Sequence, residues 1–356
     1  MRVLTVIGNR PQFVKAAAVS GPLRAQAQEV LVHTGQHYDD ELSQIFFDEL
    51  GLPRPEHRLN LGGGSNSEQT SRMLAAVAEL LEAEQPDALL VYGDTNSTLA
   101  GALAAAQASV PVAHVEAGMR SFDRRMPEEL NRVLTDHASS LLLCPSESAA
   151  RQLRDEHVHG KVEVCGDVMV DVAQLIAPRA RARTDVVAGH AVSSGDYLLV
   201  TAHRAGNVDD PHRLQRLVEL LLALPRPLVF PLHPRTRARL ERANLLTRLS
   251  SADGIRLAAP LGYVEFTALL HHARAVVTDS GGVQKEAYLA SIPCVTLRDT
   301  TEWRETVDTG WNALVDLDLE KALSALDQPV PDAHPEVYGD GRAGERVVQA
   351  LLRMAG

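Results

Sequence analysis

Residues 112–132 read VAHVEAGMRSFDRRMPEELNR. The apolar run from Val112 to Val115 predicts a buried strand that ends at Glu116, where a loop with a glycine and three arginines begins. Pro127 predicts the start of a helix, because proline has its φ angle pre-set for the first helical position and no N–H to leave unpaired. Glu116 thus follows a strand and Glu128 lies in the first turn of a helix, which is where open α/β sheets carry their functional sites. The alternative is a solvated loop whose acids only complement the helix dipole.

Apolar strands alternate with helical segments on both sides of this stretch. The predicted strands are residues 3–7, 29–33, 88–92, 112–115, 140–144, 162–165, 197–201, 228–231, 255–257, 275–278 and 294–297. Such alternation predicts an α/β fold with parallel, doubly wound sheets. A hinge-like segment, Gly166 to Asp171, and an irregular surface connection over residues 177–195 separate the two halves. We therefore predict an N-terminal domain of residues 1–168 and a C-terminal domain of residues 169–341.

The composition is that of a globular protein and limits its partners. Of the 356 residues 45% are hydrophobic and 23% are charged, and the net charge of −11 argues against non-specific nucleic-acid binding. Cys144, Cys165 and Cys294 form no Cys-x-x-Cys pair, so neither a disulfide framework nor a zinc site is expected. The N-terminal segment lacks the features of a signal peptide, and no apolar run has the length of a membrane span. These features predict a cytoplasmic protein that binds neither nucleic acid nor membranes.

Polar residues follow several predicted strands of the first half. Gly8-Asn9-Arg10-Pro11 follows the first strand, and the next helix carries Lys15 about one turn in, so that N–H groups and cations could cradle an anion. Asp94 follows another strand, where its simplest role is to cap the next helix. For Arg10 and Lys15 the alternative is a pair of exposed charged side chains.

The motif Asp279-Ser280-Gly281-Gly282 is the most informative local signal in the second half. Two glycines at a strand-to-helix turn let backbone N–H groups close on a phosphate, and the Ser280 hydroxyl adds a donor. Glu286 lies four residues beyond Gly282 and therefore faces the same side one turn deeper, where a carboxylate can accept from two ribose hydroxyls. His203, at another strand end, could donate to the same phosphate. A glycine turn required only by packing is the alternative.

Taken together, these motifs resemble those of the non-hydrolysing UDP-N-acetylglucosamine 2-epimerases, in order and over nearly the whole chain. The matching pieces are Gly8-Asn9-Arg10-Pro11 with Lys15, Gln36-His37, Gly93-Asp94-Thr95, His114 to Arg120, Pro127-Glu128-Glu129 with Asn131-Arg132, His203-Arg204, Asp279 to Gly282 with Glu286, and Arg298 to Glu302. The resemblance implies a glycosyltransferase-B architecture, in which two Rossmann-like doubly wound domains face a cleft and the second binds UDP. It also implies that a C-terminal helix, about residues 342–356, packs back on the first domain.

The resemblance further implies a reaction and its residues. UDP would leave C1 of a UDP-2-acetamido sugar as a proton leaves C2, giving a 2-acetamidoglucal, and would add back as a proton reaches the opposite face. The implied catalytic residues are Asp94, Glu116, Glu128 and, at the leaving diphosphate, His203. The implied substrate or UDP contacts are Arg10, Lys15, Arg120, Phe266, Ser280, Gly281, Gly282 and Glu286. No metal or other cofactor is implied, and the usual assembly of the family is a homodimer.

Several stretches look closer to a branch that acts on UDP-2,3-diacetamido-2,3-dideoxy-glucuronate. They include residues 232–237 and 282–286 and the sequence Thr301-Glu302-Trp303. Trp303 stands where many family members have an arginine that would reach the substrate, so both sugars stay open. Gln36 and His37 match part of a regulatory Gln-His-x-x-Met motif, but two aspartates follow them and the methionine is absent.

Two other functions fit parts of the sequence. A glycosyltransferase of the same architecture would share the Asp279 turn and Glu286, but it would not need Asp94, Glu116 and Glu128 to converge. A non-catalytic nucleotide-sugar binding protein would bind its ligand without turnover.

Overall fold

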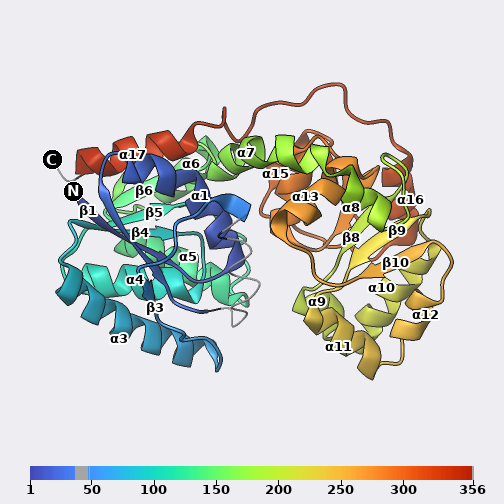
Figure 1. The fold of residues 1–356 in the computed structure, drawn as a ribbon, viewed down its shortest axis with the longest axis horizontal. Coiled ribbons are helices and arrows are strands. Elements are labelled where there is room, and N and C mark those ends of the chain that lie inside the picture. The colour runs from blue at the N-terminus through green and yellow to red at the C-terminus, as the bar shows by residue number, and fades with distance from the viewer. Residues whose placement is uncertain (37–46, 48, 355–356) are drawn as a thin grey trace. The chain divides into compact units, whose positions relative to one another are not determined.

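The computed structural model describes residues 1–36, 47 and 49–354. The chain divides into two compact units, which we call unit 1 (Met1–Gln174 with Glu336–Gly356) and unit 2 (Leu175–Pro335). Each unit is built around one parallel β-sheet (Figure 1). The helix α7 (Val168–Ala182) runs across the boundary between the units along the chain.

The sheet of unit 1 has seven strands in the order β3-β2-β1-β4-β5-β6-β7. They are β1 (Arg2–Ile7), β2 (Gln28–His33), β3 (His57–Arg58), β4 (Ala88–Tyr92), β5 (Val112–Val115), β6 (Leu141–Cys144) and β7 (Lys161–Val164). The strand β4 is fully buried along its length, since each of its five residues is 0% exposed. Continuous apolar strands of this kind are typical of a parallel sheet that helices cover on both faces.

The helices of unit 1 flank these strands, and four of them begin with a capping side chain. They are α1 (Arg10–Arg24), α3 (Asn66–Glu84), α4 (Asn96–Gln107), α5 (Pro127–Ala138), α6 (Glu147–Asp155) and α17 (Ala343–Met354). Asn9, Ser65, Thr95 and Ser146 each accept a backbone N–H in the first turn of the helix that follows. Such caps satisfy N–H groups that have no partner inside the helix, and so they fix where each helix starts.

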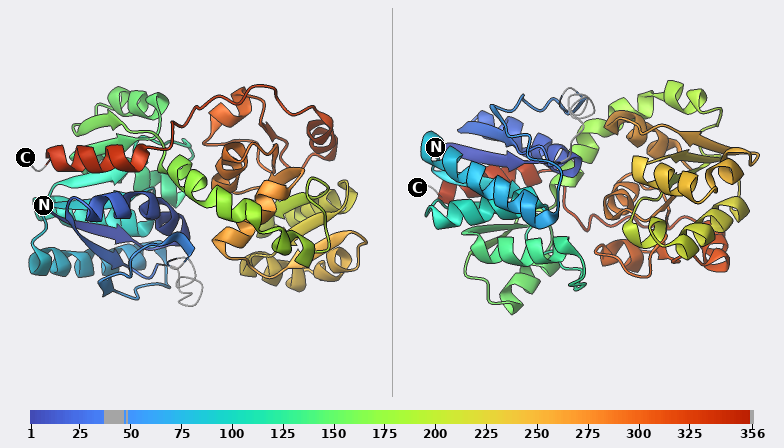
Figure 2. Two further views of the ribbon diagram at one scale, coloured as in Figure 1. Left: turned by 45° about the horizontal axis from the view of Figure 1, so that its top comes forward. Right: turned by 90° about the horizontal axis from the view of Figure 1, so that it is seen from below.

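The last helix, α17, packs against the first helix, α1, as Figures 1 and 2 show. The carboxylate of Asp171 accepts from the backbone N of Ala343 at 3.1 Å and of Gly344 at 2.8 Å, which caps α17. A Cβ at Gly344 would lie 2.2 Å from the carbonyl oxygen of Ala18, so only glycine allows the two helices to approach this closely. The C-terminal helix therefore completes unit 1, although the whole of unit 2 lies between α17 and the rest of unit 1 in the sequence.

The sheet of unit 2 has six strands in the order β10-β9-β8-β11-β12-β13. They are β8 (Leu198–Thr201), β9 (Leu228–Pro231), β10 (Ile255–Ala258), β11 (Ala275–Thr278), β12 (Cys294–Thr296) and β13 (Asn312–Leu314). The helices are α8 (Thr184–Gly189), α9 (Ala205–Val208), α10 (Pro211–Ala223), α11 (Pro234–Arg242), α12 (Leu246–Ser250), α13 (Tyr263–His272), α14 (Gly281–Leu289), α15 (Arg304–Asp308) and α16 (Leu319–Asp327). Alternate residues of β8 join two different buried clusters, Leu198 and Val200 in one and Leu199 in the other, so both faces of the sheet are covered.

The predicted fold class, α/β with parallel doubly wound sheets in both halves, is confirmed. The sequence does not predict β3 and β13, which are two and three residues long and lie in no longer apolar run. The expectation of an irregular connection over residues 177–195 is wrong, since α7 continues through Pro178 to Ala182 and α8 follows. No helix within the described residues is long and apolar enough to cross a membrane.

Candidate active site

In unit 1 the predicted site residues lie at the carboxyl ends of three adjacent strands. The order β1-β4-β5 places the turn after β1, which leads to Arg10, beside the turn with Asp94 after β4 and the loop that begins at Glu116 after β5. Parallel strands end at a common edge, so segments that are distant in the sequence meet there. The strand order reverses between β1 and β4, and open α/β sheets form their sites at such a switch point.

Lys15 contacts Glu116 at this edge. Nζ of Lys15 lies 2.7 Å from Oε1 of Glu116, and both side chains are 11% exposed. Gly93, with φ +63°, leaves the necessary space, because a Cβ there would lie 3.1 Å from Nζ of Lys15. The backbone of Glu116 has φ +70°, a left-handed conformation that is unfavourable for a residue with a side chain. Strain of this kind persists where the surroundings enforce it, and it concentrates at functional sites.

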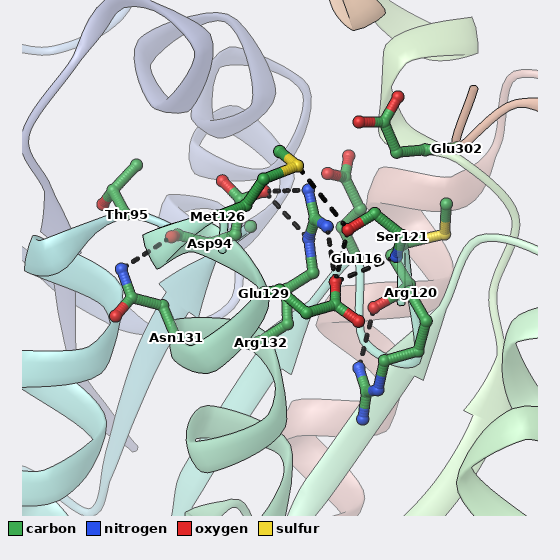
Figure 3. Close-up of polar contacts among 12 residues, drawn as sticks. Asp94, Thr95, Glu116, Arg120, Ser121, Met126, Glu129, Asn131, Arg132 and Glu302 are labelled. Carbon is green, nitrogen blue, oxygen red and sulfur yellow. Dashed lines mark hydrogen bonds and ion pairs between the residues drawn. The ribbon is translucent and has the colours of Figure 1, made fainter. Parts of the chain in front are cut away.

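Arg132 on α5 pairs with the second carboxylate of this edge. It donates from Nε and Nη2 to Oδ2 of Asp94, at 3.0 and 2.6 Å, and from Nη1 to Oε2 of Glu129 at 2.9 Å (Figure 3). Asn131 donates from Nδ2 to the carbonyl oxygen of Asp94 at 3.0 Å. The helix that Pro127 begins therefore carries an amide and a guanidinium onto the turn after β4.

The adjacent acids at the start of α5 have opposite surroundings. Glu129 is 4% exposed and accepts from N and Oγ of Ser121 and from N of Phe122, each at 2.9 Å. Burial alone would raise the pKa of Glu129, but these hydrogen bonds and one from Arg132 hold it below its ordinary value. Glu128 is exposed and has no hydrogen-bond partner among the residues that the structure describes. Glu129 thus fixes the loop before α5, while Glu128 is accessible.

Arg120, one of the predicted substrate contacts, is engaged inside unit 1. Its side chain is 2% exposed, and the guanidinium donates to Asp136 at 2.7 Å and to Glu156 at 2.9 and 2.6 Å. A third contact, 2.7 Å, joins Nη1 to the carbonyl oxygen of Met119. Carboxylates on both sides hold this side chain in one orientation.

The remaining predicted residues of unit 1 lie around the turns after β1 and β2. Arg10 is partly exposed at the start of α1, next to Asn9, whose side chain accepts the N–H of Gln12 at 3.2 Å. Gln36 accepts through Oε1 from N and Oγ of Ser97, at 3.0 and 2.7 Å, which ties the turn after β2 to α4. His37, the other half of the predicted regulatory pair, lies outside the described residues.

In unit 2 a buried carboxylate organises the corresponding strand ends. Asp279, directly after β11, is 0% exposed and accepts from the backbone N of His203 and Arg204, both at 3.0 Å, and from Nδ2 of Asn207 at 3.2 Å. These bonds hold the loop after β8 beside the turn after β11. Burial lowers the pKa of His203, and the charges of Arg204 and Arg235 lower it further, against the opposing charge of Asp279.

The turn after Asp279 has the form that its glycines predict. Ser280 is the N-cap of α14 and accepts the N–H of Val283. Gly282 is exposed, and the nearest atom to a Cβ built there is Oγ of Ser280 at 3.9 Å. The side of Gly282 at the N-terminus of α14 is therefore open, and helix N-termini are sites where proteins bind phosphate.

Glu286 lies one turn further along α14. Burial raises the pKa of Glu286 to about 7, although the charge of Lys285 acts in the opposite direction. Nζ of Lys285 lies 3.9 Å from the ring centroid of Trp303, and both residues are buried. Phe266, on α13, is partly buried against the apolar core that includes Leu269.

Several residues of this site carry no prediction from the sequence. Glu302 accepts from Arg298 at 2.9 and 3.1 Å and lies 3.5 Å from Arg204. Burial would raise the pKa of Glu302, but these two arginines lower it to about 2. The signals for Glu302 and Glu129 were their places in the motifs that begin at Arg298 and Pro127, whereas Asp136 has no signal beyond its place on a helix. Within the described residues, no cluster of three or more His, Cys, Asp or Glu side chains could hold a metal ion.

Comparison with known proteins agrees with the geometry. The family model described as UDP-N-acetylglucosamine 2-epimerase matches residues 23–352. The chain is 44% identical over 357 residues to the "UDP-N-acetylglucosamine 2-epimerase homolog" of Methanococcus maripaludis, covering 99% of this chain and 100% of the relative. It is also 44% identical over 366 residues to the UDP-2,3-diacetamido-2,3-dideoxy-D-glucuronate 2-epimerase of Pseudomonas aeruginosa, with coverage of 99% and 100%.

Solved structures show the same fold. The UDP-GlcNAc 2-epimerase of Methanocaldococcus jannaschii, in complex with UDP-GlcNAc and UDP, matches with a TM-score of 0.92 and 41% identity, over 99% of this chain and 100% of that one. The enzyme of Neisseria meningitidis bound to UDP-GlcNAc matches with a TM-score of 0.89 and 28% identity, again over 99% and 100%. The protein is thus of the α/β class with two parallel sheets, as in epimerases of the glycosyltransferase-B type. The chain belongs to the UDP-N-acetylglucosamine 2-epimerase family.

The different surroundings of Glu128 and Glu129 predict that their loss affects stability unequally. We expect Glu129→Ala to lower the free energy of unfolding by roughly 3 kcal/mol, because it leaves a buried Arg132 without one carboxylate and two N–H groups without an acceptor. The matched Glu128→Ala should change it by less than about 0.5 kcal/mol, since Glu128 is exposed. Urea denaturation at neutral pH measures both values. Equal losses in the two variants would contradict the assigned roles.

Proposed function

We propose that the protein is an isomerase that inverts C2 of UDP-N-acetylglucosamine to give the manno epimer. The proposal rests on two carboxylates, Asp94 and Glu116, which lie at adjacent strand ends of unit 1. Each is paired with its own cation, and a third acid, Glu128, is exposed on α5. Inversion requires a proton to leave one face of the sugar and to arrive at the other, which needs more than one acid/base group. The UDP-GlcNAc 2-epimerases of M. jannaschii and N. meningitidis named above support the same activity.

The proposed reaction is an elimination followed by an addition. A carboxylate accepts the C2 proton as the C1–O bond breaks, and UDP leaves with the electron pair of that bond. The product is a 2-acetamidoglucal with a C1–C2 double bond. UDP then adds back to C1 while another carboxyl group delivers a proton to the opposite face of C2. We assign these steps to Asp94, Glu116 and Glu128 as a set.

We propose that the predicted C-terminal domain, residues 169–341, binds UDP and that residues 1–168 carry the proton transfers. The N-terminus of α14, where Gly282 is exposed, and the Ser280 hydroxyl suit a diphosphate, and His203 would donate to it as negative charge develops. Glu286 would accept from the ribose hydroxyls. Arg10, Lys15 and Phe266 stay proposed substrate or UDP contacts, while the buried ion pairs of Arg120 favour an indirect role for it.

A second candidate substrate is UDP-2,3-diacetamido-2,3-dideoxy-glucuronate. Identity to the P. aeruginosa enzyme for this sugar is 44%, the same as to the M. maripaludis homolog. Trp303, which replaces an arginine common in the family, is buried with Lys285 over its ring. The position therefore offers no guanidinium to the substrate, which favours a sugar recognised differently there. A homodimer and a cytoplasmic location remain predictions.

The decisive test is epimerisation in D2O. Without added metal or nicotinamide cofactor, we expect the purified protein to convert UDP-N-acetylglucosamine or its 2,3-diacetamido uronate relative to the C2 epimer with deuterium at C2, because the abstracted proton exchanges with solvent before one returns. Proton NMR follows the C2–H signal for both sugars in parallel. An epimer that retains its C2 proton would contradict elimination, and transfer of the sugar to an added acceptor would favour a glycosyltransferase.

The carboxylate assignment predicts selective losses of turnover. Asp94→Asn, Glu116→Gln and Glu128→Gln should each lower kcat by about 10²–10⁴-fold, the usual contribution of a general acid or base. Glu147→Gln is the matched control, because Glu147 is also an exposed acid in the first helical turn, on α6. Steady-state kinetics of folded variants decide the question. Near-normal turnover in all three would remove the assignment.

The raised pKa of Glu286 predicts a pH-dependent affinity for UDP. A carboxylate accepts from two hydroxyls more strongly than a protonated carboxyl group does, so affinity should rise as the pH passes through about 7 and Glu286 ionises. If UDP binds only the ionised form, release of one proton at that pKa makes binding about 10-fold tighter at pH 8 than at pH 6. Because UDP also titrates in this range, the calorimetric titrations are compared with Glu286→Gln, which should lack this increment. The same pH dependence in both proteins would place the ribose elsewhere.

A further inference from the structure

Beneath the carboxylates of unit 1 lies a chain of buried charges that the proposed reaction does not use directly. His114 on β5 and Asp136 on α5 are both 0% exposed. Nδ1 of His114 lies 2.7 Å from Oδ1 of Asp136, and Nε2 of His114 lies 2.7 Å from the carbonyl oxygen of Gly93. Oδ2 of Asp136 accepts from Nη1 of Arg120 at 2.7 Å and from the backbone N of Gly118 at 3.2 Å.

The partner atoms determine which groups in this chain of buried charges donate a hydrogen bond and which accept one. A carbonyl oxygen can only accept, so Nε2 of His114 donates to Gly93. Burial would raise the pKa of Asp136, but the hydrogen bond and charge of His114 and the charge of Arg120 hold it below its ordinary value. Asp136 accepts from Arg120 and from Gly118, and it shares a proton with Nδ1 of His114. The ring of His114 is thus held at both of its nitrogens, by a carboxylate on one side and by a carbonyl on the other.

The chain connects the two turns that carry the proposed acid/base groups. His114 holds the carbonyl of Gly93, the residue before Asp94. Asp136 holds the N–H of Gly118, two residues after Glu116, and anchors Arg120 two residues later. A Cβ at Gly118 would lie 2.3 Å from the carbonyl oxygen of Ala149, so this loop is also packed tightly on α6. One buried carboxylate thus fixes the position of one turn relative to the other.

We propose that His114, Asp136 and Arg120 are positioning residues, which set Asp94 and Glu116 in their relative geometry before substrate binds. This inference rests on the proposed function, because it gives the two carboxylates a joint task. Reacting groups displaced by about 1 Å lose roughly 10²-fold in rate even when every group is still present. Loss of this chain of buried charges should therefore lower kcat, while unit 2 keeps its affinity for UDP.

The test compares His114→Gln and Asp136→Asn with Glu156→Gln. Glu156 pairs with the outer end of Arg120 and, among the described residues, bonds neither His114, Asp136 nor Gly118, so its variant is the matched control for a lost ion pair. Calorimetric titration with UDP counts the folded, binding-competent molecules in each preparation, and kcat is expressed per such molecule. We expect about a 10²-fold loss of kcat for the first two variants, with unchanged UDP affinity, and a rate within about twofold of wild type for Glu156→Gln.

The outcomes separate positioning from a merely structural role. Variants that fold less well but keep the wild-type kcat per UDP-binding molecule would overturn the proposal. So would an equal loss of kcat in Glu156→Gln, because that variant loses an ion pair without removing a contact to Gly93 or Gly118. A loss of kcat per UDP-binding molecule in His114→Gln and Asp136→Asn, but not in Glu156→Gln, would support it. Failure of the wild-type protein to epimerise either sugar would overturn the proposed function and the positioning role with it, while UDP binding would still be observed.

Discussion

A carboxylate taken out of water needs a cation or several N–H donors, because an unpaired buried charge costs several kcal/mol. The strand ends of unit 1 bring Asp94 and Glu116 into a partly buried edge, and the structure supplies Arg132 and Lys15 as their partners. The partners come from different helices, α5 and α1, so each ion pair also joins two segments that are distant in the sequence. The need to compensate these charges thus determines how the helices around the edge are placed.

Unit 2 meets the same requirement differently. Asp279 is satisfied mainly by backbone N–H groups, so it fixes a loop without consuming a cation. Glu302 takes two arginines and stays ionised. Glu286 is the exception, because burial raises its pKa to about 7 and only the charge of Lys285 opposes this. An acid that is incompletely compensated in this way is suited to a ligand that brings its own donors, as the two hydroxyls of a ribose would.

The sequence predicts the strands and the placement of site residues at strand ends, because buried parallel strands give continuous apolar runs and turns give glycines. It does not separate Glu128 from Glu129, since adjacent acids in a first helical turn look alike and only the packing of the Ser121 loop buries one of them. It places Arg120 with the substrate contacts, whereas the side chain lies between Asp136 and Glu156. Those partners are 16 and 36 residues away, and such pairings arise only when β5, α5 and α6 pack together.

The left-handed backbone of Glu116 shows why this packing matters for chemistry. A residue with a side chain at φ +70° costs about 1 kcal/mol relative to ordinary backbone, and it persists only if its surroundings leave no alternative. The N–H of Glu116 donates to Leu143 on β6, Gly118 is confined by α6, and Asp136 holds the loop beyond it. None of these groups is placed to react. The position of the carboxylate is therefore set by residues that lie behind it, so the segment from His114 to Arg120 acts as one rigid support.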